Sequence, residues 1–241
     1  LGALYPTLMA ISRLLADVPE PAEQGLNPLL VNHQGVMALD ARIRVSKACD
    51  GGAENFAIRP YPAELAETIE WNGRKVLLRP IRPEDEERHI EFLSHLDLED
   101  IRMRVFYSRR TMERSELARL TQIDYTREMA FVAVAPGPDG VLQTLGVARA
   151  MTDPDNISAE FGVIVRSELK GGALGKVLMD KLLRYQRDNG TQQLVATVLR
   201  ENRRMLGLTR AMGFRDAAVQ PDDETIDIEL DLQGDTAKTP S

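Results

Sequence analysis

The sequence is poor in cysteine and in aromatic residues, and it has no long hydrophobic run. Its one cysteine, Cys49, cannot form a disulfide within the chain, and such sparing use of cysteine is typical of a reducing compartment. No apolar stretch approaches the ~18 residues of a membrane-spanning helix, and the first residues lack the basic start of a secretory signal. We therefore expect a cytoplasmic protein that makes no use of a membrane.

Positive charge is also scarce. The chain carries 30 lysines and arginines against 37 aspartates and glutamates, a formal net charge of −7. Proteins that bind nucleic acid usually present a basic face, so this balance argues against nucleic acid and favours a cationic partner, such as a lysine side chain. The three histidines, His33, His89 and His95, are scattered, so we expect no metal site and no Ser-His-Asp or Cys-His catalytic set.

The first part of the chain predicts a small unit. Residues 1–45 read as a helix followed by a hairpin, with strands at 29–32 and 36–40. A piece of this size rarely builds a stable core alone, so it must rest on other parts of the protein. The chain begins with Leu1 rather than methionine, and we expect a fragment of a longer protein.

The remainder predicts one larger domain. Residues 46–74 read as a linker and a second hairpin, in which Asn72-Gly73 is the strongest short hairpin signal because both residues tolerate positive φ. Residues 75–233 form the expected domain, and 234–241 a flexible tail. The expected helices of this domain are 83–96, 99–106, 115–122, one that begins near Lys176, and 202–212 with Gly213 as its C-terminal cap. The expected strands of the domain are 130–135, 143–151, 158–165, 193–198, 216–220 and 225–232.

The most informative segment is a small-residue loop, Lys170-Gly-Gly-Ala-Leu-Gly175, between a strand and a helix. Free N–H groups and the positive end of a helix dipole favour an anion such as phosphate there. A Walker A loop is excluded, because only three residues separate Gly171 from Gly175 and Val177 follows Lys176. A dinucleotide fingerprint is excluded because a lysine occupies its first glycine position. The loop alone leaves open a turn that merely uses glycine.

The surroundings of this loop resemble a known superfamily. Residues 160–179 and 202–214 resemble the GNAT N-acetyltransferases, whose acyl-CoA loop reads Gln/Arg-x-x-Gly-x-Gly/Ala; here it is Lys170-x-x-Ala173-x-Gly175, with departures at the first two fixed positions. Further segments resemble the Pat-type bacterial protein lysine acetyltransferases: 78–85, 121–125, 127–130 and 159–161. The N-terminal segments 27–31 and 38–42 are similar to the closing hairpin of the ATP-grasp domain in NDP-forming acyl-CoA synthetase-like regions.

The resemblance implies a fold and a function. The fold would be α/β (α+β), a GNAT domain with a mixed, mostly antiparallel sheet flanked by helices, preceded by an ATP-grasp remnant. The function would be direct transfer of the acetyl group of acetyl-CoA to a lysine ε-amine, with acyl-CoA synthetases as the expected protein targets and no metal. Two alternatives stay open: a non-catalytic module that senses acyl-CoA, and acetylation of a small-molecule amine.

The resemblance also implies site residues. Glu160 matches the general base, which acts through a water on a lysine whose free pKa is about 10.4; a solvated strand glutamate is the alternative. Asp124 and Glu128 would line the lysine entrance or supply a second base, unless they lie in a solvated loop. The backbone of Val163, Ile164 and Val165 would pair with the pantetheine arm, and the N–H of Val163 would stabilise the oxyanion. The other expected cofactor-binding residues are Lys170, Gly171, Gly172, Ala173, Leu174, Gly175, Lys176, Asn202 and Met205.

Four positions qualify these assignments. Asn202 also reads as an ordinary helix N-cap, which does not exclude a cofactor contact. Thr209 stands where many GNAT enzymes have a tyrosine general acid, so that role is unassigned. Asn27 and Asp40 match metal-associated positions of the ATP-grasp family, but with the nucleotide-binding lobe missing we expect no ligase activity.

Overall fold

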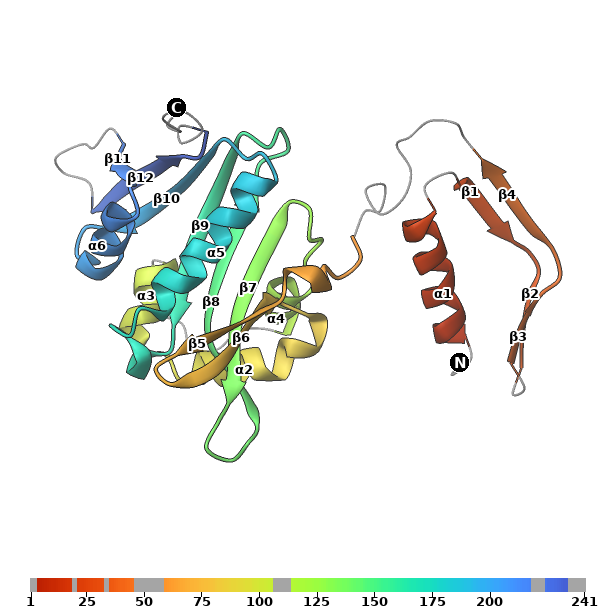
Figure 1. Ribbon diagram of the computed structural model, residues 1–241, viewed down its shortest axis with the longest axis horizontal. Helices are drawn as coiled ribbons and strands as arrows, with labels where there is room; N and C mark the ends of the chain where they lie inside the picture. Colours follow the sequence, from red (N-terminus) through yellow and green to blue (C-terminus); the bar gives the residue numbers. More distant parts are fainter. Residues whose placement is uncertain are drawn as a thin grey trace, which may run out of the picture. The chain divides into compact units, whose positions relative to one another are not determined.

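The chain folds into two units, one within Leu1–Pro60 and the other within Tyr61–Ser241 (Figure 1). The structure is a computed structural model, and it describes residues 4–18, 21–32, 35–45, 59–105, 114–217 and 224–233. Most of the expected linker, with Cys49, and the expected tail lie outside the described residues, as does His33. In the part that is described, no helix has the length and apolarity to cross a bilayer.

The first unit contains a helix and a long hairpin in two sections. Its elements are α1 (Leu4–Asp17), β1 (Pro21–Leu26), β2 (Leu29–Asn32), β3 (Gly35–Ala38) and β4 (Ala41–Val45). The expected hairpin is present as the antiparallel pair β2–β3, and β1 pairs with β4 in a further ladder that the sequence did not predict. The N–H of Asn27 bonds to the C=O of Asp40 (3.2 Å) between the two sections.

The second unit is built on one eight-stranded sheet with helices on both faces. Its strands are β5 (Glu67–Trp71), β6 (Arg74–Pro80), β7 (Glu128–Pro136), β8 (Leu142–Thr152), β9 (Ser158–Val165), β10 (Gln193–Leu199), β11 (Arg215–Asp216) and β12 (Thr225–Asp231). Its helices are α2 (Glu86–Ser94), α3 (Leu98–Val105), α4 (Arg114–Thr121), α5 (Leu174–Asp188) and α6 (Arg203–Ala211), with 3₁₀ turns η2 (Ala63–Leu65), η3 (Pro83–Asp85) and η4 (Ser167–Leu169).

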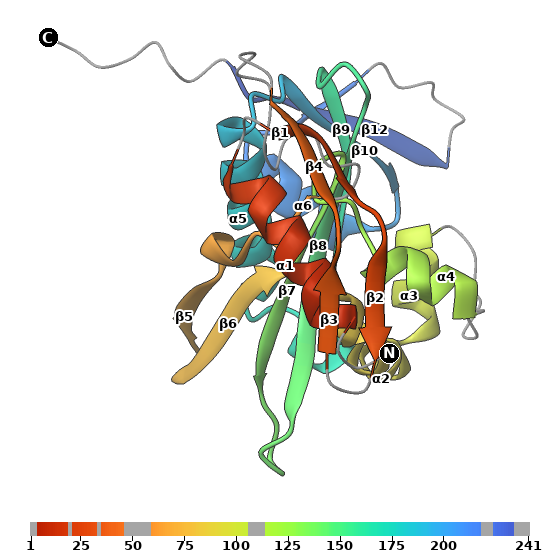
Figure 2. The same ribbon diagram turned by 90° about the vertical axis from the view of Figure 1, so that its right-hand side faces the viewer.

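The strand order is β11-β12-β10-β9-β8-β7-β6-β5, and β9–β10 is the parallel pair among otherwise antiparallel neighbours. Helices α2, α3 and α4 lie on one face of the sheet and α5 and α6 on the other (Figure 2). The expected fold class, a mixed and mostly antiparallel sheet flanked by helices, is therefore confirmed.

The β5–β6 hairpin forms one edge of this sheet. Its turn residues Asn72 and Gly73 both have positive φ, 49° and 72°, the conformation that the Asn-Gly signal predicts. Because β6 pairs with β7, the hairpin packs as part of the compact unit Tyr61–Ser241.

The core lies on both faces of the sheet, and the part under α5 positions the site. Leu174, Leu178 and Leu182, one turn apart, are buried, and they pack with the continuously buried strand β7 and with Phe161 in one hydrophobic cluster. Helix α6 ends as expected at Gly213, whose φ of 93° permits a Schellman motif. These elements fix the ends of β9, α5 and α6, where the candidate site lies.

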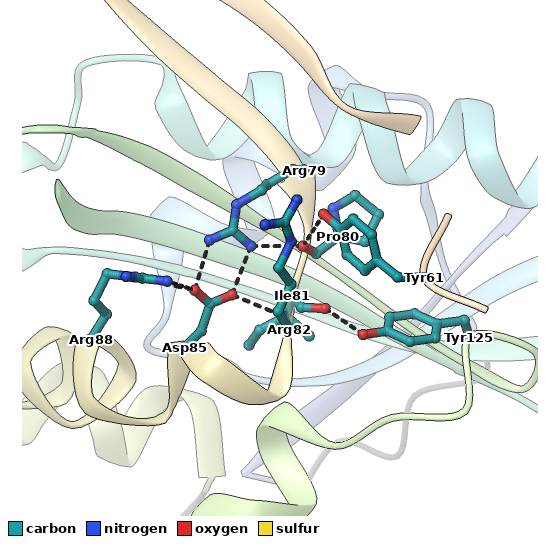
Figure 3. A network of polar contacts seen from close by, with 8 residues as sticks. All are labelled: Tyr61, Arg79, Pro80, Ile81, Arg82, Asp85, Arg88 and Tyr125. Carbon is teal, nitrogen blue, oxygen red and sulfur yellow. Dashed lines mark hydrogen bonds and ion pairs between the residues drawn. The ribbon is translucent and has the colours of Figure 1, made fainter. Parts of the chain in front are cut away.

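A buried ionic network fixes the start of α2 (Figure 3). Asp85 accepts two hydrogen bonds from the Arg79 guanidinium, both 2.7 Å, one from the N–H of Arg82 (2.8 Å), and others from Arg88. Burial alone would raise the pKa of Asp85, but these hydrogen bonds outweigh burial and lower that pKa to about 2. The Asp85 carboxylate is therefore ionised in the folded domain at neutral pH.

Two tyrosines extend the network to the strand that precedes α2. The Tyr61 hydroxyl donates to the C=O of Pro80 (3.1 Å), and the Tyr125 hydroxyl donates to the C=O of Ile81 (2.8 Å). Arg82 lies over the Tyr61 ring, 4.3 Å from its centroid. The crossing from β6 to α2 is thus held from several sides.

Acid destabilisation of this domain is expected to depend on His89. This residue is buried, its Nδ1 has no hydrogen-bond partner among the described residues, and Arg149 and Asp85 are the charges that act on it. Burial and the charge of Arg149 lower the pKa of His89 from 6.5 to about 4, against the opposite effect of Asp85. The unfolded chain therefore takes up the proton first, and about 3 kcal/mol of stability is lost as the pH falls from 6.5 towards 4.

Urea unfolding at several pH values measures this loss. The variant His89→Leu should flatten the dependence between pH 6.5 and 4, whereas His95→Gln, at an exposed histidine, should keep it. An unchanged slope in His89→Leu would contradict the assignment.

Candidate active site

The two parallel strands β9 and β10 separate after a short ladder. They pair only where Ser158, Ala159 and Glu160 face 193–195, and beyond this point each strand continues without the other. A cleft of about 480 Å³ opens between them. Besides the predicted residues described below, its walls include Asp100, Met103, Phe161, Gly162, Leu169, Ala196, Thr197, Val198, Arg204 and Leu208.

One edge of β9 presents unpaired backbone groups to this cleft. The N–H of Arg166 bonds to the C=O of Leu145 (2.9 Å), and antiparallel bonding alternates along the strand, so Ile164 also bonds towards β8. The backbone groups of Val163 and Val165 then face the cleft. All three predicted strand residues line it, but the alternation gives the free donors and acceptors to Val163 and Val165.

The predicted phosphate loop lies at the end of the cleft where α5 begins. Gly171 and Ala173 both adopt left-handed backbone, with φ of 82° and 64°. Ala173 thus keeps the loop conformation despite its methyl group, at a cost of about 1–2 kcal/mol. The first N–H groups of α5, from Leu174 onward, have no partner within the helix, and Leu174, Gly175 and Lys176 line the cleft.

Gly172 is the one predicted loop residue that does not line the cleft. Its Cα faces the indole of Trp71, and a Cβ placed there would lie 2.8 Å from Cζ2 of that ring. The loop therefore has a cleft side and a side that packs against the β5–β6 hairpin.

The lysine expected to meet phosphate has a partner of its own. Lys170 Nζ forms an ion pair with Asp100 of α3, and Asp97 lies 3.9 Å away. Lys176 pairs with Asp180 at 2.7 Å on the exposed side of α5. Within the described residues, Arg204 is the cleft-lining cation without an ion-pair partner, so it adds positive charge that the sequence reasoning did not identify.

Helix α6 and its N-cap residue form a further wall of the cleft. The Oδ1 of Asn202 accepts a hydrogen bond from the Met205 N–H (3.1 Å), so Asn202 is the N-cap, and both residues also line the cleft. Thr209 is fully buried, and its hydroxyl donates to the C=O of Met205 (3.0 Å). A hydroxyl held in this way is no substitute for the tyrosine acid of related sequences.

Glu160 belongs to a row of paired residues that crosses the sheet. The row runs Glu128 (β7), Met151 (β8), Glu160 (β9), Val195 (β10) and Glu229 (β12). Directly paired residues share a face, and neighbouring strands are about 4.8 Å apart, so Glu160 stands about 10 Å from each of the other two glutamates, which are about 19 Å from one another. Their shared face is that of α2, α3 and α4, because Arg149, two residues before Met151, contacts the C=O of Leu120 in α4.

The structure separates the three predicted acidic residues by their partners. Glu128 forms an ion pair with Arg149. One Asp124 oxygen accepts the N–H groups of Thr126, Arg127 and Glu128 at 2.9–3.0 Å, which closes the turn before β7. Glu160 is exposed and, within the described residues, has no ion-pair partner. Glu160 is therefore the carboxylate available to a substrate, while Asp124 and Glu128 hold structure together.

The cleft residues missed by the sequence reasoning divide into two kinds. Arg204 lies in the first turn of α6, between the predicted residues Asn202 and Met205, so its place in the sequence gave a usable signal. Asp100 and Met103 reach the cleft from α3, about 60 residues before the strand they approach, and no local pattern announced them. In the described part of the chain, no group of three or more His, Cys, Asp or Glu side chains is arranged to hold a metal ion.

Two family models match the chain, and each covers one of its units. Residues 75–215 match the acetyltransferase (GNAT) domain, and residues 1–45 match an ATP-grasp domain. An acetyltransferase from Pseudomonas aeruginosa strain PAO1 is 34% identical over 157 residues, which are 64% of this chain and 82% of that protein.

Solved structures share the fold at lower identity. The GNAT domain of S. lividans PAT has a TM-score of 0.65 at 21% identity, covering 71% of this chain and 99% of that one. A spermidine N-acetyltransferase from Vibrio cholerae, in complex with CoA and spermine, has a TM-score of 0.53 at 18% identity, covering 65% and 95%. A phosphinothricin acetyltransferase from Sinorhizobium meliloti, in complex with AcCoA, has 0.53 at 19% identity, covering 69% and 93%. With its GNAT model match over more than half its length, the chain belongs to the GNAT acetyltransferase family and is an acetyl-CoA-dependent N-acetyltransferase.

Proposed function

We propose that this enzyme acetylates the ε-amine of a lysine in a protein, by direct transfer while donor and acceptor are bound together. The observation that carries the proposal is the position of Glu160. It lies on β9 at the point where the ladder to β10 ends, next to the cleft, and its exposed carboxylate has no ion-pair partner among the residues that the structure describes.

The cleft fits an acyl-CoA by the chemistry of its walls. Val163 and Val165 offer backbone donors and acceptors in extended form, as a strand would, which suits the two amides of a pantetheine arm. The N–H groups at the start of α5 suit a pyrophosphate, and Arg204 adds charge. When bound, acetyl-CoA supplies the acetyl group. The N–H of Val163 would steady negative charge on the acetyl oxygen.

The acceptor side fits a cation. The exposed residues Asp227, Glu229 and Asp231 alternate along β12, on the face of the sheet that carries Glu160. Their summed charge favours approach of a protonated amine. Glu160 then takes a proton from that amine, directly or through one water, so that the nitrogen lone pair is free to attack.

The proposed target class is acyl-CoA synthetases. Support comes from the N-terminal unit, because an ATP-grasp match beside an acetyltransferase domain is the arrangement of the large Pat-type enzymes that the sequence resembles. Acetylation of an active-site lysine would remove its charge and so inactivate such a target.

A small-molecule amine is the second candidate. The acidic stripe of β12 would also attract a polyamine, and one structural neighbour is a spermidine acetyltransferase. A sensor without transferase activity gains its support from Thr209, which leaves the general-acid position empty. A thiolate is a good leaving group, however, because thiols have a pKa of about 8.5.

Mass measurement on the acceptor tests the proposal. The full chain is incubated with acetyl-CoA and a candidate acyl-CoA synthetase, and in a parallel sample with spermidine. We expect the synthetase to gain one acetyl group on a lysine, and the gain to be lost with Glu160→Gln. Acetylation of spermidine alone would contradict the protein target and support the second candidate. Binding of CoA with no acetylated product in either sample would support the sensor.

A further inference from the structure

We propose that Trp71 is a positioning residue for the phosphate loop, and that it acts through Gly172. This inference rests on the proposed use of the cleft for acetyl-CoA. Trp71 ends β5 at the sheet edge and does not line the cleft, so any effect on the bound phosphate must pass through the loop.

Trp71 contacts the loop in two ways. Its indole Nε1–H donates a hydrogen bond to the C=O of Gly172 at 2.5 Å. Its ring also packs against the Gly172 Cα so closely that a Cβ would lie 2.8 Å from Cζ2, closer than real Cβ contacts allow. Only glycine fits between the ring and the loop, although Gly172 itself has no left-handed φ.

Neighbouring residues also hold Trp71 itself in place. It is 7% exposed, and Arg74 lies over its ring, 5.1 Å from the centroid. Glu67, on the same side of β5, contacts α5 further along, with Lys181 at 3.0 Å and Arg184 at 2.7 Å. The edge strand β5 is therefore linked to α5 at two places. Ion pairs from Glu67 reach the middle of the helix, and the indole of Trp71 contacts the loop that leads into its first turn.

The position of this bond explains its effect on phosphate binding. Gly172 lies between two left-handed residues, Gly171 and Ala173, and the alanine is strained by its methyl group. Strained backbone persists only where the surroundings hold it. The bond from Trp71 fixes the peptide between these two residues, and so it sets the direction in which the following N–H groups of α5 point.

Trp71 is also the only tryptophan of the chain, which makes it a direct probe. A ligand that binds the N–H groups of the loop changes the field and mobility around the indole. We expect the tryptophan fluorescence to change as CoA is added, with half of the change complete at the Kd measured by calorimetry. Pantetheine, which lacks the phosphates, should bind more weakly and leave the emission nearly unchanged.

Two substitutions separate positioning from folding. Trp71→Phe keeps an aromatic ring but removes the N–H donor, and Gly172→Ala pushes a methyl group against Cζ2. We expect the Kd for CoA and the KM for acetyl-CoA to rise about 5- to 20-fold in each, with kcat at saturation unchanged. In the double variant the smaller phenyl ring leaves room for the methyl group, so adding Gly172→Ala should cost less than it does alone. Gly207→Ala, on α6 with open space around its Cα, serves as the glycine control and should match the unaltered chain.

The outcomes distinguish this inference from the proposed function. The positioning role would be overturned if the unaltered chain bound CoA and Trp71→Phe bound it with the same affinity. It would also be overturned if Trp71→Phe lost affinity for CoA and for pantetheine equally. Thermal unfolding of each variant belongs to the test, because reduced stability with unchanged CoA affinity would also overturn it. Failure of the unaltered chain to bind CoA at all would overturn the proposed function and this inference together.

Discussion

Replacing Glu160 with glutamine is expected to lower kcat for acetyl transfer by about 10²- to 10⁴-fold, the usual contribution of a general base. The amide keeps the size and hydrogen-bonding capacity of the side chain but cannot accept a proton from the amine. Because Glu160 stands beside the cleft and not among the residues that line it, the affinity for CoA should stay within about twofold. Steady-state kinetics with the acceptor that the enzyme acetylates give kcat, and calorimetry with CoA gives the affinity.

The row across the sheet supplies a matched control. Glu229 lies on the same face, two strands away from Glu160, and is also exposed. Glu229→Gln removes the same charge without removing the base, so it should raise KM for a cationic acceptor modestly and leave kcat alone. The loss in Glu160→Gln should shrink as the pH rises, because more of the amine is then already deprotonated. Equal kcat in Glu160→Gln and the unaltered enzyme at every pH would contradict the assignment.

Replacing Asp85 with leucine is expected to destabilise the domain by about 3–5 kcal/mol, because it leaves the buried charge of Arg79 without a partner. The loss should appear in urea unfolding as a lower midpoint with an unchanged slope. It should also loosen the crossing from β6 to α2 shown in Figure 3, since the N–H of Arg82 loses its acceptor.

Two variants test the cause of this loss. Arg79→Met combined with Asp85→Leu removes both buried charges and should recover most of the stability. Glu99→Gln breaks an exposed pair with Arg102 and should leave the urea midpoint nearly unchanged. The pKa of about 2 places the titration of Asp85 in strong acid, so its contribution is complete above pH 4 and falls as the pH drops towards 2. A loss below 1 kcal/mol in Asp85→Leu would contradict the network's role.

Much of the fold follows from local signals in the sequence. Asn72-Gly73 predicted a turn with two positive φ angles, and Gly213 predicted the end of α6, because few residues besides glycine and asparagine adopt those conformations at low cost. The apolar run at 158–165 gave the bounds of β9 as the structure has them. Where one residue type satisfies one local requirement, short windows are enough.

The parts that could not be predicted depend on contacts between distant segments. The pairing of Lys170 with Asp100 joins a loop to a helix 70 positions earlier, so the lysine expected to meet phosphate also links the loop to α3. The bond from Trp71 to Gly172 spans a still longer separation. From the sequence alone Glu128 reads as an acid without a partner, but in the fold strand β8 places Arg149 beside it. In each case the residue type was visible, but its partner was set by the tertiary arrangement of distant segments.

The divergence of β9 from β10 has a consequence for the solubility of the enzyme. Strands with unpaired backbone groups readily associate with strands of other molecules, and proteins usually hide or charge such edges. Here the free edge at Val163 and Val165 lies inside a cleft whose walls come from α3, α5 and α6. A second protein strand carries a side chain at every residue and would need more room between these walls than the slender arm of an acyl-CoA, whose amides can pair with the free edge. The same walls that shape the substrate site thus guard the enzyme against aggregation.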